Sequence, residues 1–130
     1  MNFSPDFLTV EDIMEIHSDL IASFGGAPEI RDSAALESAV AQVQATFQGE
    51  FLHHDLFEMA SAYIFHLSGN HPFLDGNKRV ALGSGLVFLE MNGISILDPE
   101  GKLYPFMMQV ASGEKSKAQI VEFLKNLNNQ

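Results

Sequence analysis

The sequence of 130 residues contains no cysteine and no tryptophan, and only seven of its residues are lysine or arginine. Without cysteine, the chain can form neither disulfide bonds nor thiolate metal centres. The seven basic residues stand against 17 acidic ones, which gives a net charge of −10 at pH 7. A surface of this sign lacks the basic footprint that nucleic acids and anionic membranes require. We therefore expect no direct contact with nucleic acid or with a membrane.

Long hydrophobic runs are also missing. The longest apolar stretch, residues 80–89, is interrupted by glycine and serine and is far shorter than the roughly 20 residues that span a bilayer. Residues 1–6 show no basic and apolar regions of the kind found in secretory signals. Hydrophobic residues nevertheless make up 46% of the chain, which excludes intrinsic disorder. We expect one domain over residues 1–130, in a cytoplasmic protein.

Apolar residues recur at helical spacing through most of the sequence, which predicts an all-α fold. In the first helix this apolar face comprises Ile13, Ile16, Leu20 and Phe24. Capping residues and changes of pattern predict helix starts at Thr9, Asp32 or Ser33, Asp55, Asn77, Asp98 and Ser116. Between the second and third helices, a Gly49 turn flanked by Phe47 and Phe51 indicates a short hairpin.

The helix predicted from about Asn77 to Met91 is apolar almost all round. Such a helix is normally buried on every side, so we expect it to lie at the centre of a bundle. Gly83 and Gly85 interrupt it, and each glycine costs about 1 kcal/mol of helix propensity relative to alanine. We expect the compensation to be the close approach of a neighbouring helix.

Residues 70–79, with the sequence NHPFLDGNKR, place polar and ionisable side chains directly before this apolar helix. A polar cluster where local rules predict apolar packing indicates a functional site. A helix that starts at Gly76-Asn77 exposes unpaired N–H groups, which form an anion site together with the helix dipole. Lys78 and Arg79 occupy the first turn, where carboxylates are favoured. A bound phosphate would supply the missing negative charge.

Two further residues of this segment suggest chemistry. The helix dipole and the nearby cations should favour neutral His71, the form that a general base requires. Asp75 is a hard oxygen ligand that suits Mg²⁺ shared with a nucleotide. Together these residues predict transfer of a phosphate-containing group. The residues alone also permit a plainer interpretation: a structural histidine, a turn aspartate, an Asn77 helix cap and a solvated pair of cations.

The run from His71 to Arg79 resembles the signature of the Fic/Doc superfamily, H-x-F-x-[D/E]-[G/A]-N-[G/K]-R. The resemblance extends to residues 24–32 and 44–47 and covers about residues 10–97. It implies an all-α, Fic-like helical bundle around a buried central motif helix, with a small β-hairpin flap. In such a fold the flap aligns a segment of the target by strand addition. Here the flap would comprise Thr46, Phe47, Gln48, Gly49, Glu50 and Phe51.

The resemblance also implies a role for each residue of the motif. His71 would be the base that deprotonates a target hydroxyl, and Phe73 would be an apolar anchor. The cofactors would be ATP and Mg²⁺, with Asp75 as the metal ligand. The phosphates would be contacted by Gly76, Asn77, Lys78 and Arg79.

Two departures from the AMP-transferring Fic enzymes indicate the death-on-curing (Doc) branch. Lys78 stands where those enzymes have glycine, and Leu82 stands where they have a second arginine. The Doc branch implies a toxin of a toxin–antitoxin system. Such a toxin inhibits translation by transferring the γ-phosphate of ATP to a Ser or Thr hydroxyl of a protein, in this family elongation factor Tu. A small antitoxin protein would restrain it. The alternatives are a Fic-like AMP transferase and a non-catalytic, partner-binding member.

The remaining candidates receive structural interpretations. His53-His54-Asp55 is a poor chelating set because adjacent side chains point in different directions. His17 and His66 lie on predicted helices and are expected to be half-buried or exposed packing residues. Arg31-Asp32 is expected to form a structural turn or an ion pair.

Overall fold

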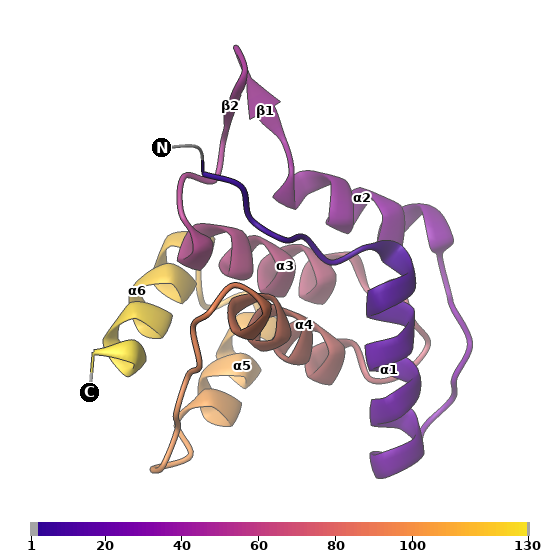
Figure 1. Ribbon diagram of the computed structural model, residues 1–130. Helices are drawn as coiled ribbons and strands as arrows, with labels where there is room; N and C mark the ends of the chain where they lie inside the picture. Colours follow the sequence, from indigo (N-terminus) through magenta and orange to yellow (C-terminus); the bar gives the residue numbers. More distant parts are fainter. Residues whose placement is uncertain (1–2, 130) are drawn as a thin grey trace.

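Six helices and a two-stranded hairpin form the computed structural model, which describes residues 3–129 (Figure 1). Residues 1–2 and 130 of the domain predicted over 1–130 lie outside the described part. The elements, in chain order, are α1 (Val10–Phe24), α2 (Ser33–Val43), β1 (Thr46–Phe47), β2 (Glu50–Phe51), α3 (Leu56–Asn70), α4 (Asn77–Met91), α5 (Leu103–Ala111) and α6 (Lys117–Asn128). The all-α prediction with a small hairpin is therefore confirmed.

Side-chain caps set the start of four of these helices, as the sequence predicted. Thr9 and Ser116 form capping boxes at α1 and α6. Asp32 accepts a hydrogen bond from the backbone of Ala35 at α2, and Asp55 accepts one from the backbone of Glu58 at α3. Each cap satisfies an N–H group that the first helical turn leaves without a partner.

The predicted helix start at Asp98-Pro99 is wrong. Helix α5 begins at Leu103, four residues beyond Pro99. The Asp98 carboxylate still acts as a cap, because it accepts hydrogen bonds from the backbone N–H groups of Lys102 (2.7 Å) and Leu103 (2.9 Å). A turn at residues 99–100 separates the aspartate from the helix that it caps, and this turn takes up Pro99.

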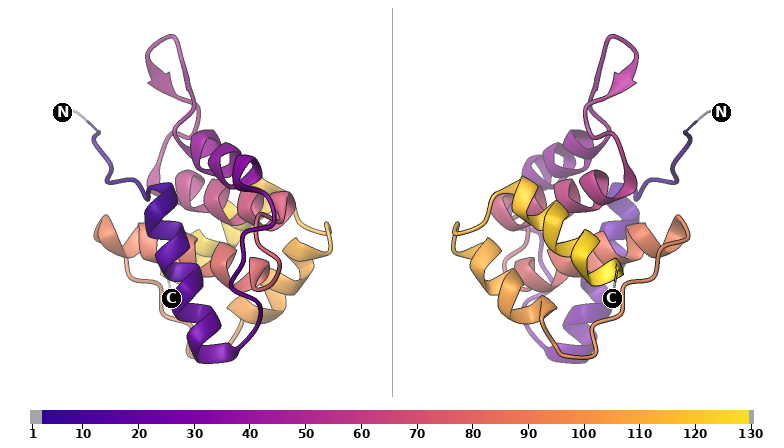
Figure 2. Two further views of the ribbon diagram at one scale, coloured as in Figure 1. Left: turned by 90° about the vertical axis from the view of Figure 1, so that its right-hand side faces the viewer. Right: turned by 90° about the vertical axis from the view of Figure 1, so that its left-hand side faces the viewer.

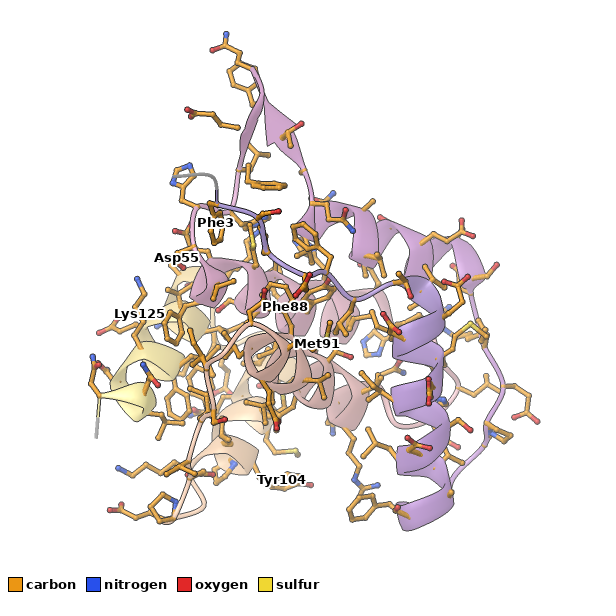
Figure 3. All side chains as sticks on the ribbon, in the orientation of Figure 1. Phe3, Asp55, Phe88, Met91, Tyr104 and Lys125 are labelled. Atoms are coloured by element: carbon orange, nitrogen blue, oxygen red, sulfur yellow. The ribbon has the colours of Figure 1, made fainter. Side chains whose placement is uncertain are left out.

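Helices α3 and α4 pack against each other at the centre of the molecule. Helices α2 and α6 contact α3, α1 contacts α4, and α5 contacts both (Figures 1 and 2). Phe88 of α4 is fully buried in the middle of the bundle and packs on Tyr63 of α3, with the ring centroids 5.2 Å apart (Figure 3). One side of α4 is fully buried, whereas the other side is only half-buried. The expectation that α4 is buried on every side is therefore only partly met.

The two glycines of α4 differ in their surroundings. A Cβ atom built on Gly85 would lie 2.6 Å from Cγ1 of Ile64 on α3, a distance that real contacts do not reach. A Cβ atom on Gly83 would lie 3.6 Å from Ile16 on α1, which is ordinary van der Waals contact. The predicted close approach is therefore confirmed for Gly85 and not for Gly83.

The hairpin projects away from the helices at the end where α2 stops and α3 begins (Figures 1 and 2). Its two central residues, Gln48 and Gly49, have φ angles of 53° and 83°, and positive angles at both positions are the mark of the tight turn that fits twisted strands. At the base of the hairpin, the ring of Phe51 packs on Phe7 and Phe3, with centroids 5.5 and 6.4 Å apart. The N-terminal segment thus supports the hairpin.

None of the helices within residues 3–129 combines the length and the apolar character that crossing a membrane would need.

Candidate functional site

The six residues between α3 and α4, His71–Gly76, form a loop that we call the motif loop. This loop and the first turn of α4 line one side of an open cleft of about 350 Å³. Its lining residues are His71, Leu74, Asp75, Gly76, Asn77, Lys78, Arg79 and Tyr104. The structure therefore brings together at one cleft all the motif residues predicted for the base, the metal ligand and the phosphate contacts. Phe73, the predicted anchor, lies behind them in the core.

The start of α4 has the features of an anion site. Its N-cap is Gly76 in the left-handed conformation (φ 80°), and within the described chain no side chain caps the first turn. That turn contains no acidic residue and carries exposed Lys78 and Arg79. Unpaired N–H groups, the positive end of the helix dipole and two cations therefore face the cleft together, an arrangement that attracts a phosphate.

The Asn77 side chain does not cap the helix but holds the motif loop. Its Oδ1 accepts a hydrogen bond from the backbone N–H of Phe73 (3.0 Å), and its Nδ2 donates one to the Phe73 carbonyl (2.8 Å). Both polar groups of one backbone residue are thus satisfied by one amide. The side chain is committed to the loop, so contact of Asn77 with a phosphate would use its backbone N–H.

A buried aromatic pair supports the motif loop from beneath. Phe73 is 1% exposed, and its ring stacks on the imidazole of His17 with centroids 3.7 Å apart. The Nε2–H group of His17 also donates a hydrogen bond to the Asp75 carbonyl (2.7 Å). His17 was expected to be half-buried or exposed, and this expectation is wrong, because its side chain is buried. Its contacts with Phe73 and Asp75 connect α1 to the motif loop.

Asp75 is held at the edge of the cleft by the segment that follows α1. Its Oδ2 accepts a hydrogen bond from the backbone N–H of Ala27 (2.7 Å). A Cβ atom on Gly26 would lie 3.2 Å from the Cβ of Asp75, so the glycine permits this close approach. No three His, Asp or Glu side chains gather into a metal site within the described residues. A Mg²⁺ ion at Asp75 would therefore take its other ligands from phosphate oxygens and water.

The segment between α1 and α2 runs alongside the motif loop. The backbone N–H groups of Arg31 and Asp32 both donate to the Pro72 carbonyl, at 2.8 and 3.0 Å, and the N–H of Leu74 donates to the Glu29 carbonyl (3.2 Å). The Arg31 side chain donates to backbone carbonyls at the end of α3. The prediction of a structural role for Arg31-Asp32 is confirmed, although backbone contacts take the place of an ion pair.

Phe24 follows the helical spacing of the apolar residues of α1, but it is the last residue of the helix and its side chain is 61% exposed. The guanidinium carbon of Arg79 lies 4.3 Å from the centroid of its ring. An arginine over an aromatic face is held by the electrostatic attraction between its charge and the ring. Phe24 therefore restricts the position of Arg79 beside the cleft.

The hairpin predicted to position a target is not brought to His71. It joins the end of α2 to the start of α3, whereas His71 follows the other end of α3 (Figure 1). The 15 residues of α3 correspond to a helix about 22 Å long. The segment that lies beside the motif loop is residues 27–32, through the contacts described above. A target-positioning role of the hairpin stays a prediction.

Tyr104 is the cleft residue that sequence reasoning missed. It lies at the start of α5, is 60% exposed and points away from the helical core (Figure 3). No local signal in the sequence connects it with a motif that ends 25 residues earlier. Only the packing of α5 beside α4 brings it to the cleft.

A second polar cluster lies outside the cleft. The Lys117 ammonium group donates hydrogen bonds to Nε2 of His53 (3.1 Å) and Nε2 of His66 (3.3 Å). Burial and the Lys117 charge lower the pKa of both imidazoles, that of His66 to about 4. Both imidazoles therefore stay neutral near pH 7. Their hydrogen bonds to Lys117 connect α6 with α3 and with the segment that follows β2. Two residues after His53, Asp55 forms an ion pair with Lys125 at 3.3 Å (Figure 3).

The sequence of the chain is similar to that of known proteins. The profile of the Fic/DOC family matches residues 7–89. Over 121 residues the chain is 34% identical to "Protein kinase doc" of Escherichia phage P1, and the alignment covers 92% of this chain and 94% of the relative. Over 91 residues it is 36% identical to "Toxin Doc" of Mycolicibacterium smegmatis, covering 70% of this chain and 68% of the relative.

Proposed function

The chain belongs to the Fic/DOC family, and we propose that it is a Doc-like toxin that transfers the γ-phosphate of ATP to a Ser or Thr hydroxyl of a target protein. One observation carries the proposal. A single cleft presents a histidine, a carboxylate, two cations and an uncapped helix start. These are the groups that phosphoryl transfer needs for the base, the metal and the phosphates. The relatives named above as a protein kinase and a toxin point in the same direction.

The residues of the cleft fit ATP and Mg²⁺. A volume of about 350 Å³ lies within the range of small-ligand pockets. The uncapped turn of α4, with Lys78 and Arg79, would bind the phosphates, and Asp75 would hold the metal. The metal would neutralise charge on the phosphate oxygens.

In the proposed reaction, the imidazole of His71 accepts the proton of the target hydroxyl. The hydroxyl oxygen forms a bond to the γ-phosphorus of ATP while the bond between this phosphorus and the β–γ bridging oxygen breaks, and ADP leaves. Lys78 and Arg79 compensate the negative charge on the phosphate oxygens. His71 is exposed at the cleft, so a hydroxyl group of another protein can reach it.

Two positions favour γ-phosphate transfer over AMP transfer. Lys78 places a long side chain where AMP-transferring relatives have glycine, and so hinders close approach of a nucleotide to the backbone. Leu82, where those relatives have a second arginine, lines a small apolar pocket beneath α5 and α6. Its side chain therefore supports the core and supplies no charge to a phosphate.

The proposal extends to partners and location. The target would be a translation component, elongation factor Tu in the known members of this branch, and the site of action would be the cytoplasm. A small antitoxin protein would restrain the toxin. The net charge of −10 favours partner segments of basic or apolar character.

The test uses purified protein, Mg²⁺ and a ribosome-free lysate, with ATP labelled separately at the α- or the γ-phosphate. We expect label on a lysate protein from γ-labelled ATP only. The label should be lost in His71→Ala and retained in His54→Ala, a matched control because His54 is an exposed histidine outside the cleft. Transfer from the α-phosphate would instead establish AMP transfer. A second experiment expresses the protein in cells and measures growth. Growth arrest that persists unchanged in His71→Ala would contradict the catalytic role of His71 and favour a partner-binding role.

A further inference from the structure

Arg31 makes contacts that the proposed chemistry leaves unexplained. Its Nε donates a hydrogen bond to the carbonyl of His71 (2.6 Å), and its Nη2 donates one to the carbonyl of Asn70 (2.9 Å). The side chain is exposed and is not among the residues that line the cleft. Arg31 therefore reaches the candidate base only through the backbone.

His71 has an unusual backbone conformation. It is the C-cap of α3 and adopts the left-handed region, with φ 46° and ψ 56°. Among residues 3–129, the only other non-glycine residue with a positive φ is Gln48, in the hairpin turn. The left-handed region is unfavourable for residues with a Cβ atom, and such residues keep it only where their surroundings enforce it.

The two carbonyls that Arg31 binds belong to the two peptide planes on either side of the His71 Cα atom. The orientation of these planes relative to each other is set by φ and ψ of His71. The guanidinium group is planar and presents its N–H donors in a rigid fork. When one guanidinium group binds both carbonyls, it restrains both dihedral angles, and with them the direction of the Cα–Cβ bond that carries the imidazole.

Charge strengthens this contact. The end of α3 carries the negative pole of the helix dipole, and its last turn contains no basic residue. A cation at this position is favourable, and hydrogen bonds from a charged donor are stronger than neutral ones. The backbone N–H of Arg31 also donates to the Pro72 carbonyl (2.8 Å), so three consecutive carbonyls, from Asn70 to Pro72, bind the same arginine.

We propose that Arg31 is a positioning residue that enforces the left-handed conformation of His71 and so aims the imidazole at the acceptor hydroxyl. The inference rests on the proposed function for its kinetic consequence only. A misplaced base lowers the rate of the chemical step, whereas ATP is held by other residues, at the start of α4.

The kinetic test compares the two arginines of the chain. In Arg31→Ala we expect kcat of phosphate transfer to fall about 100-fold, as for a 1 Å misplacement of a reacting group, with an unchanged KM for ATP. In Arg79→Ala we expect KM for ATP to rise. Arg31→Lys keeps the positive charge but not the planar pair of N–H donors, so its kcat should fall less than that of Arg31→Ala. Guanidinium ions at millimolar concentration should partly restore kcat of Arg31→Ala, whereas methylammonium should not. Unchanged kcat in Arg31→Ala, or a loss that no guanidinium restores, would overturn the proposal.

A second measurement needs no activity. The Cα and Cβ chemical shifts of isotopically labelled histidine report backbone conformation, and the His71 signal is identified by its loss in His71→Gln. We expect these shifts to leave the left-handed range in Arg31→Ala while the signals of the other four histidines stay in place. Unchanged His71 shifts would refute the positioning role even in an active enzyme. A wild-type protein without transfer activity, combined with altered shifts in Arg31→Ala, would refute the proposed function and leave the positioning role standing.

Discussion

The two glycines of α4 should respond in opposite ways to the same substitution. Gly85 faces α3, where a Cβ atom would lie 2.6 and 2.7 Å from two side-chain atoms of Ile64 and 3.2 Å from the Ala60 carbonyl oxygen. Gly83 faces α1, where a Cβ atom would find Ile16 and Leu20 at 3.6 and 3.7 Å. We therefore expect Gly85→Ala to destabilise the protein and Gly83→Ala to stabilise it.

The magnitudes follow from two opposing effects. Either substitution removes the backbone freedom of glycine from a helix, which stabilises by about 0.5–1 kcal/mol. At Gly85 the new methyl group must displace Ile64, which is buried and β-branched and so has few alternative rotamers. Overpacking of this kind costs about 1–3 kcal/mol. The net expectation is a loss of about 1–2 kcal/mol for Gly85→Ala and a gain of up to about 1 kcal/mol for Gly83→Ala.

Thermal and urea unfolding followed by circular dichroism will measure the difference. For a chain of this size, 1 kcal/mol corresponds to roughly 4 °C in Tm, so the two variants should differ by roughly 4–12 °C. Each variant is the matched control of the other, because both add one methyl group to the same helix. The reasoning would be refuted if Gly85→Ala were as stable as Gly83→Ala at an unchanged denaturant m-value.

Three further predictions concern polar contacts. Because the pKa of His66 falls from 6.5 to about 4 on folding, the unfolded state binds more protons between these values. The free energy of unfolding should therefore drop as the pH falls from 6.5 to 4, by up to about 3 kcal/mol. Lys117→Met should make this drop smaller in unfolding titrations, and an equal drop would contradict the assignment. Tyr63→Phe leaves the buried N–H and carbonyl of Leu8 without their partner and should cost about 1–3 kcal/mol in urea unfolding. Asn77→Ala removes two hydrogen bonds and should lower the free energy of unfolding by about 1–2 kcal/mol. The proposed transfer activity should also fall at temperatures where the fold persists. Full activity would show that the loop keeps its shape without this amide.

Features encoded by neighbouring residues were predictable from the sequence. Thr9, Asp55 and Ser116 cap their helices because a short polar side chain can satisfy N–H groups within its own turn. The hairpin was predictable for the same reason, since its turn depends on residues 48–49. Asp98 shows the limit of such reasoning. Its chemistry as a cap was foreseen, but the intervening turn moves the helix start to Leu103.

Features encoded by distant residues were not predictable. The motif indicated which side chains share the cleft, but its sequence contains no sign that Arg31 binds the His71 carbonyl or that His17 stacks on Phe73. Tyr104 joins the cleft only because α5 packs beside α4. The apolar period of α1 includes Phe24, but it does not show that the helix ends there and leaves the ring exposed beneath Arg79.

The contacts of the motif loop also determine when the site can form during folding. The hydrogen bonds that His17, Ala27 and Arg31 make to this loop join residues 40 to 58 positions apart in sequence. Closing loops of this length costs conformational entropy, which is offset only by the contacts that form when the helices of the bundle pack together. A fragment that contains α3, the loop and α4 would carry the complete motif without the residues that shape it. We therefore expect the geometry of the candidate site to form only after α1 has docked, so that a partly folded chain carries the motif residues without their arrangement.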